Sequence, residues 1–466
     1  MKDKKYVVTC AQYNARANSK FLDSLKHYCD QHQAELVVMG TYGKHNSERT
    51  FRPSLTNKLA EFENARVLDG TEEFKFNSNI RAQRRMGYPQ NARPLTGLRR
   101  RAAKTGSLII ENPKQYLEVA PTSVDDLPRL LMSTGACTRP NYNDSDDKTT
   151  SFMRLRKGLN ARDDHTYGAV ILEIENDKMF HARHIKSSKK SGRFVDLGIE
   201  YHPDGSQHQA KLTQMILGDW HVGDTDPQVR DATFRMFEEF SPKEVYLHDF
   251  FNGHSISHHL SKQVVNKAKM LHTRTHDMTL EGELEQAARE LEHIYNINGK
   301  RDLYLVASNH NEWIDRYIQD RRFVDDDLNF RMAVKIADAM NDGKDALEFG
   351  LRYHWNDMPD NINFLGRRND HKRWGYLLGA HGDRGKSGAR GSICSIEESY
   401  GKAIVGHSHT PANWNNDTLV VGTSTRLDLP YTDGYASSWM NTHALIWEHG
   451  RPQLINIIDG KYRNEK

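Results

Sequence analysis

The sequence predicts an α/β protein in two parts: a mixed α/β accessory domain at residues 1–208 and a larger domain at residues 209–466. Its 466 residues exceed the roughly 100 to 200 of an ordinary domain. In the second half, short apolar runs alternate with stretches of helical spacing, and the chain then ends in several strand-like runs. This order is typical of two stacked sheets with helices outside them, so we expect that architecture at residues 209–466.

The N-terminal part begins with a strand, a helix and a second strand. Residues 6–11 and 36–40 are apolar and β-branched, and residues 18–33 have the spacing of an amphipathic helix capped by Asn18 or Ser19. No GxGxxG motif follows the first strand, so a dinucleotide site has no support. Further strands are expected at residues 107–110, 116–120, 169–174 and 194–199.

The C-terminal part starts with an apolar strand at residues 215–217. A helix is expected at residues 227–240, with Pro227 in its first turn, where a missing N–H costs nothing. The pattern then predicts helices at residues 279–295, 311–319 and 328–341, and strands at residues 244–247, 303–307, 376–378, 402–405, 419–421, 444–447 and 454–458.

Composition excludes several classes of protein. The 65 Lys+Arg and 62 Asp+Glu give a net charge of +3, which says little about partners. The four cysteines have no CxxC spacing, which argues against disulfides or a thiolate zinc site and for a reducing compartment. No apolar run approaches about 18 residues and no signal-peptide apolar region is present, so we expect a cytoplasmic protein without membrane contact.

Local charge is more informative than net charge. Three basic groups lie in the N-terminal part, with glycine, serine and tyrosine between them. Lysine and arginine supply most sequence-independent affinity for nucleic acid, so these groups suggest a phosphate footprint, with a solvated surface as the alternative. The groups are Arg81, Arg84, Arg85, Arg93, Arg99, Arg100, Arg101 and Lys104; Arg154, Arg156, Lys157 and Arg162; and Lys186, Lys189, Lys190 and Arg193.

Polar clusters stand at or just after five of the predicted strands. They are GDWHV at 218–222, HDFFN at 248–252, SNHNE at 308–312, AHGD at 380–383 and GHSH at 406–409. Strand ends are where an α/β scaffold converges ligands on one edge of a sheet. Carboxylate, imidazole and amide oxygen without thiolate suit Mn²⁺, Fe or Zn²⁺, and one carboxylate can bridge two ions about 3.5 to 4 Å apart.

In this order the clusters resemble the calcineurin-like metallophosphoesterase superfamily, whose motifs run D-x-H, G-D-x-x-D, G-N-H-[DE], a lone H and G-H-x-H. The resemblance covers about residues 211–458 and implies the two-sheet sandwich of that superfamily. It also implies a catalytic role for His310, which would contact the scissile phosphate and help protonate the leaving oxygen after in-line attack by a metal-bound hydroxide. The implied metal ligands are Asp219, His221 and His409 for one ion, Asp249 as the bridge, and Asn309, His381 and His407 for the second.

The chain departs from these motifs in places that adjoin the ligands. Asn252 stands where many relatives have an acidic residue that orients the catalytic histidine, and an amide brings no charge to stabilise a protonated His310. Gly253 replaces the arginine of Ser/Thr protein phosphatases, which counts against that branch. Ser308 replaces a glycine, and the acidic Glu312 comes one position late. No implied ligand is lost, so we expect an active enzyme.

Several other polar residues are candidates for substrate contacts. The loop 382–391 is rich in glycine and carries Arg384, Lys386 and Arg390, which we expect to bind substrate phosphates beside the metals. A basic stretch precedes it, with Arg367, Arg368, Lys372 and Arg373. Another five polar residues could contact the metal ligands or the substrate, or could simply be hydrophilic loop positions. They are Asp224, Asp226, His254, His258 and His259.

The resemblance implies a two-metal phosphodiesterase that uses Mn²⁺, with Fe, Zn²⁺ or Mg²⁺ as other candidates. The first hypothesis is a DNase similar to the Mre and SbcD type nucleases or to phage DNases that degrade host DNA, which would place it in the host cytoplasm. The N-terminal extension is unlike Mre-type proteins, which puts their capping domain and ATPase partner in doubt. The alternatives are a small-molecule or nucleotide phosphodiesterase or phosphatase with the N-terminal half as lid or oligomerisation module, and a DNA-binding scaffold with a degenerate site. The sequence leaves open whether a homo-oligomer forms.

Overall fold

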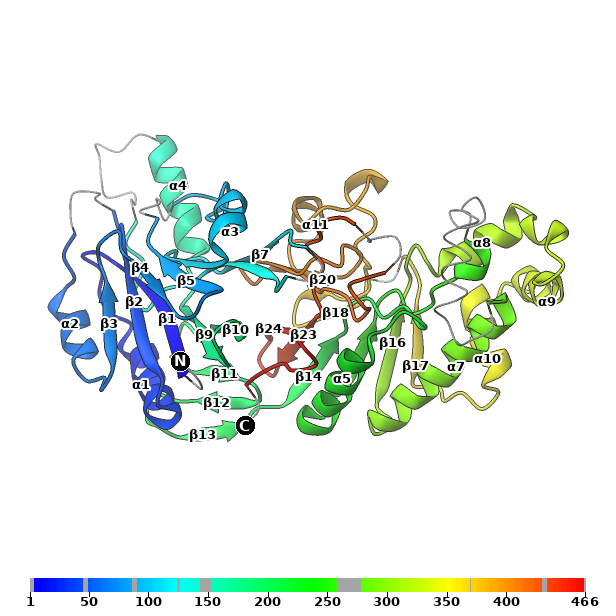
Figure 1. Ribbon diagram of the computed structural model, residues 1–466, viewed down its shortest axis with the longest axis horizontal. Helices are drawn as coiled ribbons and strands as arrows, with labels where there is room; N and C mark the ends of the chain where they lie inside the picture. Colours follow the sequence, from blue (N-terminus) through cyan, green and yellow to red (C-terminus); the bar gives the residue numbers. More distant parts are fainter. Residues whose placement is uncertain are drawn as a thin grey trace.

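The computed structural model of the protein describes residues 4–44, 49–85, 90–123, 126–142, 152–257, 278–368, 370–429 and 434–464. Figure 1 shows an elongated molecule, with the first strands of the chain at one end and helices α7 to α10 at the other. A sheet with strands from both halves of the chain crosses the middle. The chain is therefore of the α/β class, as the sequence predicts.

A five-stranded sheet in the order β10-β9-β1-β2-β3 forms the N-terminal end. Strands β1 and β2 are parallel, and the helix α1 between them begins where the Asn18 side chain accepts a hydrogen bond from the amide of Phe21. The bounds are Lys4–Gln12 for β1, Ser19–His32 for α1, Glu35–Thr41 for β2, Ala65–Leu68 for β3, Gly168–Ile174 for β9 and Phe180–Lys186 for β10.

A ten-stranded sheet joins the two halves of the chain, in the order β18-β19-β20-β22-β21-β7-β8-β6-β5-β4. Antiparallel pairing of β21 with β7 places Trp414 opposite Tyr116, so the N-terminal strands continue the sheet of the C-terminal ones. The bounds are Glu73–Lys75 (β4), Ile80–Gln83 (β5), Ser107–Ile110 (β6), Tyr116–Ala120 (β7), Arg129–Ser133 (β8), Lys372–Arg373 (β18), Tyr376–Leu377 (β19), Ala403–Val405 (β20), Ala412–Trp414 (β21) and Thr418–Val420 (β22).

A six-stranded sheet in the order β17-β16-β15-β14-β23-β24 stacks on the C-terminal strands of the ten-stranded sheet. Strands β14 to β17 are parallel, so their carboxyl ends meet at one edge. The bounds are Leu212–Ile216 (β14), Pro227–Phe240 (α5), Glu244–Leu247 (β15), Leu280–Ile297 (α7), Asp302–Val306 (β16), Ile362–Leu365 (β17), Thr442–Trp447 (β23) and Arg451–Asn456 (β24).

Shorter elements complete the fold. A three-stranded sheet contains β11 (Phe194–Asp196), β12 (Ile199–Tyr201) and β13 (Gln207–Gln209). The other helices are α2 (Pro53–Leu59), α3 (Arg99–Thr105), α4 (Phe152–Asp163), α8 (Glu312–Gln319), α9 (Phe330–Asn341), α10 (Ala346–His354) and α11 (Ile393–Tyr400). Single 3₁₀ turns are η1 (His254–Ile256), η2 (Arg322–Asp325) and η3 (Lys386–Gly388).

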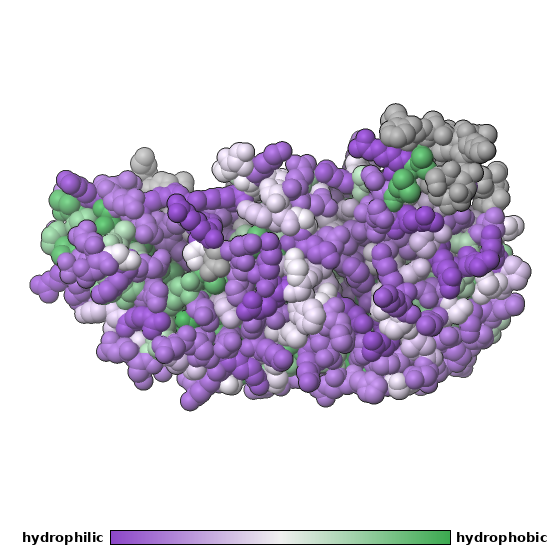
Figure 2. Space-filling model, turned by 180° about the vertical axis from the view of Figure 1, so that it is seen from behind, coloured by the Kyte–Doolittle hydropathy of each residue, from purple (hydrophilic) through white to green (hydrophobic). Residues whose placement is uncertain are grey.

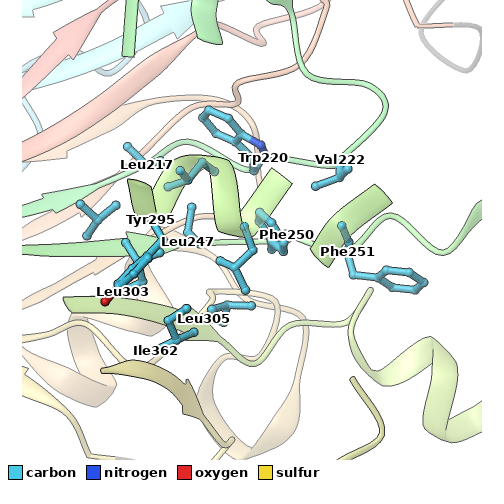
Figure 3. Packing of buried hydrophobic residues seen from close by; sticks show 14 of the residues in the cluster. Leu217, Trp220, Val222, Leu247, Phe250, Phe251, Tyr295, Leu303, Leu305 and Ile362 are labelled. Carbon is cyan, nitrogen blue, oxygen red and sulfur yellow. The ribbon is translucent and has the colours of Figure 1, made fainter. Parts of the chain in front are cut away.

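Both faces of the six-stranded sheet are buried, which explains the apolar runs with which its central strands β14, β15 and β16 end. Met215 and Leu217 face the helix layer of α5, α7, α9 and α10, whereas Ile216 between them faces the ten-stranded sheet. Figure 3 shows Leu247, Leu303 and neighbouring residues of this helix-facing core packed together. Burying one such side chain contributes about 1.5 to 3 kcal/mol, so this core fixes the strands whose ends carry the polar clusters.

The predicted elements of the second half and of the N-terminal opening are present. The helix at residues 227–240 and the strands at residues 107–110, 116–120 and 244–247 have the predicted bounds. The single strand expected at residues 194–199 is wrong. Leu197 (φ 42°) and Gly198 (φ 85°) are left-handed, and they turn the chain between β11 and β12.

Hydrophilic side chains cover most of the face seen in Figure 2. Over the described ranges, the helices are too short or too polar for any one of them to span a bilayer. The four cysteines, all in described parts of the chain, are free, and three of them are buried.

Candidate metal centre

The first predicted ligands lie at the shared carboxyl edge of β14, β15 and β16. Asp219 and His221 follow β14, Asp249 follows β15, and Asn309 and His310 follow β16. Asp219, His221 and Asp249 are at most 3% exposed, because main-chain hydrogen bonds from Trp220, His221 and Val222 to the turn after β15 hold the two strand ends together.

The remaining ligands come from the facing sheet. His381 follows β19, and His407 and His409 follow β20. The amide of Gly406 donates to the carbonyl of His381 at 2.8 Å, which joins these two turns. The amide of His407 also donates to Asp219 Oδ2 at 2.8 Å, so the two sheets meet at the cluster.

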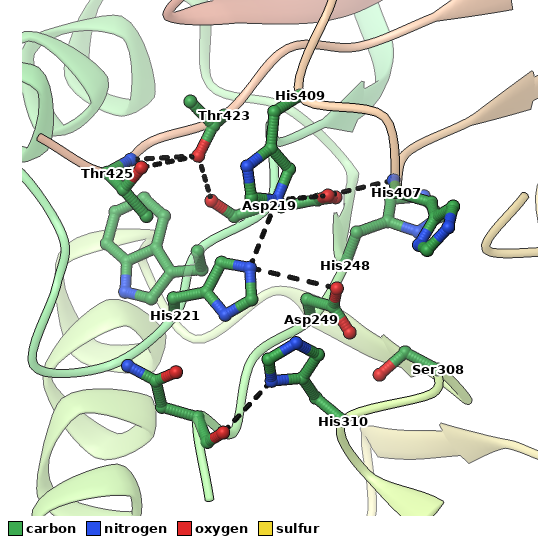
Figure 4. A network of polar contacts seen from close by, with 12 residues as sticks. Asp219, His221, His248, Asp249, Ser308, His310, His407, His409, Thr423 and Thr425 are labelled. Carbon is green, nitrogen blue, oxygen red and sulfur yellow. Dashed lines mark hydrogen bonds and ion pairs between the residues drawn. The ribbon is translucent and has the colours of Figure 1, made fainter. Parts of the chain in front are cut away.

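The structure brings six of the predicted ligands into groups whose side-chain atoms lie close enough for a metal ion. One group holds Asp219, His221, Asp249 and His409, and another holds Asp249, His381 and His407. Asp249 belongs to both, as a bridging carboxylate would. Figure 4 shows Asp249 beside both His221 and His310, with His407 and His409 above them in the view.

Short contacts in the cluster join atoms of the kinds that bind metals. His381 Nε2 lies 3.0 Å from Asp249 Oδ2, and His409 Nε2 lies 3.1 Å from Asp219 Oδ2. His221 Nε2 lies 3.2 Å from His409 Nε2 and 3.7 Å from Asp249 Oδ2. The two imidazole nitrogens point toward the same place. A cation bound there could be coordinated by both of them.

Orphaned polar atoms provide the test of whether these residues fit a metal. Asp219 Oδ1, Asp249 Oδ1, Asn309 Oδ1 and His409 Nδ1 are buried and have no hydrogen-bond partner. Buried polar atoms are normally satisfied, so several orphans in one place indicate a missing ligand. Because these atoms are oxygens and imidazole nitrogens, the set fits divalent ions with mixed N/O coordination.

The backbone at the cluster is held in an uncommon conformation. His221, Asp249, His407 and His409 have φ of 47°, 41°, 73° and 55°, in the left-handed region that costs free energy for residues other than glycine. Gly406, which precedes His407, has a different constraint. A Cβ added there would lie 2.2 Å from Asp219 Oδ1, so only glycine leaves room for the carboxylate.

Neutral groups around Asp219 fix the strand end that carries it. The amide of Gly218 donates to His443 Nδ1 at 3.0 Å, and the Ser424 hydroxyl donates to the carbonyl of Gly218 at 2.9 Å. The Thr423 hydroxyl donates to the carbonyl of Asp219 at 3.1 Å. Burial lowers the pKa of His443 to about 3, so its ring stays neutral and Nδ1 remains an acceptor.

Electrostatics in the cluster couple the histidines to the carboxylates. Burial disfavours a charge on His381, but the carboxylates of Asp249 and Asp219 outweigh it and raise the pKa of His381 to about 9. Burial similarly opposes the charge on Asp249, yet His381 and His310 hold the pKa of that carboxyl well below its usual range. An imidazolium at His381 therefore balances the two carboxylates when no metal is bound.

His310 stands beside the ligand cluster with its ring fixed on both sides. Its Nδ1 donates to the main-chain carbonyl of Asn252 at 2.9 Å, and its ring stacks on Trp313 with centroids 4.0 Å apart. The His221 ring lies 4.7 Å away. Burial lowers the pKa of His310. The hydrogen bond between Asn252 and His310 thus comes from the main chain of Asn252.

The Asn252 side chain joins a buried network instead. Its Nδ2 donates to Asp224 Oδ2 at 2.7 Å, and His254 Nε2 donates to the same oxygen at 2.9 Å. Asp224 thereby places a carboxylate next to the Asn252 side chain, which is itself an uncharged amide. Asp226 has a structural role as the N-cap of α5. His258 and His259 lie outside the described residues.

The glycine-rich loop 382–391 lies beside the cluster, but its cations differ in availability. Arg384 donates to both Glu312 oxygens, at 2.8 and 2.7 Å, and is therefore already paired. Lys386 and Arg390 are exposed. Arg367 donates to both oxygens of Asp383, at 2.6 and 2.9 Å, and fixes the loop against β17.

Sequence reasoning missed several residues of the site. His248 is fully buried with its Nδ1 3.2 Å from His381 Nδ1, so it sets the orientation of that ring. The Asp383, Arg367 and Glu312 network and His443 were also missed. Asp383, Glu312 and His248 belong to the polar clusters and Arg367 to the basic stretch, but nothing in the sequence assigns these contacts to them, and His443 lies on a strand without any motif.

The N-terminal basic groups are partly structural. Arg84 is 5% exposed and donates to the carbonyls of Gly40 and Gly70 and to the Tyr13 hydroxyl. The prediction that Arg84 contacts phosphate is therefore wrong. Arg81 and Arg101 both pair with Glu73. Arg99 in α3 pairs with Glu118, although its side chain is 61% exposed.

Comparison with known proteins finds a similarity that extends along nearly the whole chain. Protein A1 of Escherichia phage T5 is 26% identical to this chain over 483 residues, which cover 98% of the chain and 83% of Protein A1. The similarity therefore includes both halves. Its name states no activity. None of the protein-family models compared with the chain matches it, and no solved structure matches it either.

Proposed function

We propose that this protein is a two-metal phosphodiesterase that hydrolyses DNA. The observation that carries the proposal is the convergence of Asp219, His221 and His409 on one side of Asp249, and of His381 and His407 on the other. This ligand arrangement and the two stacked sheets support the metallophosphoesterase sandwich. When bound, two divalent ions, with Mn²⁺ the first candidate, would supply an activated water and positive charge for the phosphate oxygens.

The residues of the chain have distinct tasks in this proposal. The six side chains named above, together with Asn309, would hold the ions. Gly406 has no Cβ and therefore leaves room for the Asp219 carboxylate. His310 donates its Nδ1 proton to the Asn252 carbonyl, which leaves Nε2 for the substrate. A bound phosphate favours the protonated imidazole, which can then pass a proton from Nε2 to the leaving oxygen.

Exposed cations beside the cluster favour a polymer of phosphates as substrate. Lys386 and Arg390 of the loop after His381 are exposed. Such cations bind the DNA backbone without regard to sequence. The pairing of Arg384 with Glu312 supports the alternative, a phosphodiesterase of small molecules or nucleotides, because it removes one predicted phosphate contact.

Hydrolysis assays test the proposal. Linear and circular double-stranded DNA, single-stranded DNA and a small phosphodiester are incubated with wild type or His310→Ala in Mn²⁺, Mg²⁺ or chelator. We expect wild type to degrade DNA in a metal-dependent way. The His310→Ala variant should lose this activity but still bind Mn²⁺. Turnover of the small ester alone would favour the alternative. If no substrate were hydrolysed in either Mn²⁺ or Mg²⁺, an enzymatic role would be contradicted.

A further inference from the structure

A cavity of about 220 Å³ lies directly beside His407, where the N-terminal half meets the metal centre. Arg99 of α3 and Glu118 of β7 line it from the N-terminal side. Ile393 and Ile396 of α11 and Pro411 before β21 line it from the other side. The cavity is distinct from the ligand cluster, because of the seven predicted ligands only His407 belongs to its wall.

The chemistry of this wall suits a flat heterocycle better than a phosphate. Its side chains are mostly apolar, from Ile393, Ile396 and Val405 to Trp414. The one cation, Arg99, is neutralised by Glu118, whose Oε2 lies 3.0 Å from Arg99 Nε. A planar guanidinium held in this way can stack on a base or donate to its edge, and apolar walls cover the faces of the ring.

From these features we propose that the cavity receives the base of the nucleotide next to the scissile phosphate. The inference rests on the proposed function, because the phosphate would lie at the ions that His407 helps to hold. A base is joined to its phosphate through one sugar, so a cavity that shares His407 with the metal centre is within reach of that base. A paired base must first unstack, so unpaired and single-stranded DNA would be the favoured substrates.

This proposal gives the N-terminal half a role at the active site. Pairing of β7 with β21 sets Tyr116 opposite Trp414 and thereby fixes Glu118 beside the cavity. A second link, two 2.8 Å hydrogen bonds between the main chains of Thr122 and Ser437, holds the end of β7. The wall formed by Arg99 and Glu118 is therefore part of the fold and needs no closing movement.

Two variants test the cavity in different ways. Ala412→Phe adds a ring at a half-buried position of the wall, whereas Arg99→Ala removes an exposed side chain of the wall. Arg100→Ala is the matched control, because it makes the same charge change on the same helix at a residue outside the wall. Circular dichroism and Mn²⁺ titration of each variant confirm the fold and the metal centre.

Binding is measured first, by calorimetry in Mn²⁺ with thymidine 5′-monophosphate and with inorganic phosphate. Wild type should bind the nucleotide at least about tenfold more tightly than phosphate, the effect of burying one base. Ala412→Phe and Arg99→Ala should reduce that ratio, and Arg100→Ala should keep it. Equal affinity of wild type for both ligands, or an unchanged ratio in both wall variants, would overturn the proposal.

Turnover separates this inference from the proposed function. Thymidine 5′-(p-nitrophenyl phosphate) and methyl p-nitrophenyl phosphate share the leaving group, and only the first carries a base. Wild type should have the higher kcat/KM for the nucleoside ester, and Ala412→Phe should remove the difference. Equal turnover of both esters by wild type would refute the base cavity and leave the phosphodiesterase standing. Hydrolysis of neither ester would count against the phosphodiesterase, and the binding ratio would then decide the cavity alone.

Discussion

Replacing Gly406 by alanine should disable the metal centre through a single methyl group. The added Cβ would lie 2.2 Å from Asp219 Oδ1, and contacts under 3.0 Å essentially never occur, so the carboxylate or the turn must move by at least about 0.8 Å. The Cβ of His248, 3.1 Å away on another side, limits where the methyl group can go. Metal–ligand distances tolerate only about ±0.2 Å, so a displacement of this size removes Asp219 as a ligand.

The expected cost differs between the two states of the protein. Without metal, overpacking should lower the free energy of unfolding by about 1 to 3 kcal/mol. With Mn²⁺ at 100 times the wild-type Kd, wild type should gain about 2.7 kcal/mol, and Gly406→Ala should gain much less. Urea unfolding with and without Mn²⁺ measures both quantities, and calorimetry measures the Kd directly.

Gly366→Ala is the matched control. A Cβ at Gly366 meets nothing within 4 Å, and Gly366 lacks the positive φ that would strain alanine. Its stability and its gain from Mn²⁺ should match wild type. The reasoning would be refuted if Gly406→Ala bound Mn²⁺ as tightly as Gly366→Ala does.

Three further predictions concern the surroundings of the cluster. His310→Ala should lower kcat about 10² to 10⁴-fold, the usual contribution of a general acid, and should leave the affinity for Mn²⁺ unchanged. An equal loss of kcat and of Mn²⁺ affinity would show that His310 has a structural role only. Asp224→Asn should lower the free energy of unfolding by about 1 to 3 kcal/mol, because it leaves two buried donors poorly satisfied. Asp226→Asn should be neutral in the same urea titration, since asparagine caps helices as well as aspartate does. His184 and His165 are buried with pKa values lowered to about 4, and the unfolded chain takes up their protons below about pH 6.5. Stability in chelator should therefore fall as the pH drops from 6.5 to 4, approaching about 1.4 kcal/mol per pH unit for each histidine; a flat profile would show that these rings are not held neutral.

The sequence predicts the ligand cluster because each of its residues follows closely after a buried strand. Apolar strands such as β14 and β15 are recognisable from short-range pattern alone, and parallel pairing then brings Asp219 and Asp249 to one edge. The order of the motifs and their resemblance to a superfamily added the assignment of each ligand. Each of these signals can be read without knowing which distant segments of the chain pair with one another.

What the sequence could not predict depends on contacts between distant segments. Pairing of β7 with β21 joins residues far apart in the chain, and neither strand carries a motif that specifies its partner. Arg84 lies in a basic run, and only the folded structure shows that it is buried against Tyr13. Asn252 contacts His310 through its main chain, which no side-chain pattern can reveal.

Anomalous diffraction at the manganese edge from crystals grown in Mn²⁺ tests the central claim most directly. The account predicts two peaks about 3.5 to 4 Å apart, with Asp249 between them. His221 and His409 should contact one peak, and His381 and His407 the other. A single peak, or two peaks that do not share Asp249, would contradict the two-metal centre.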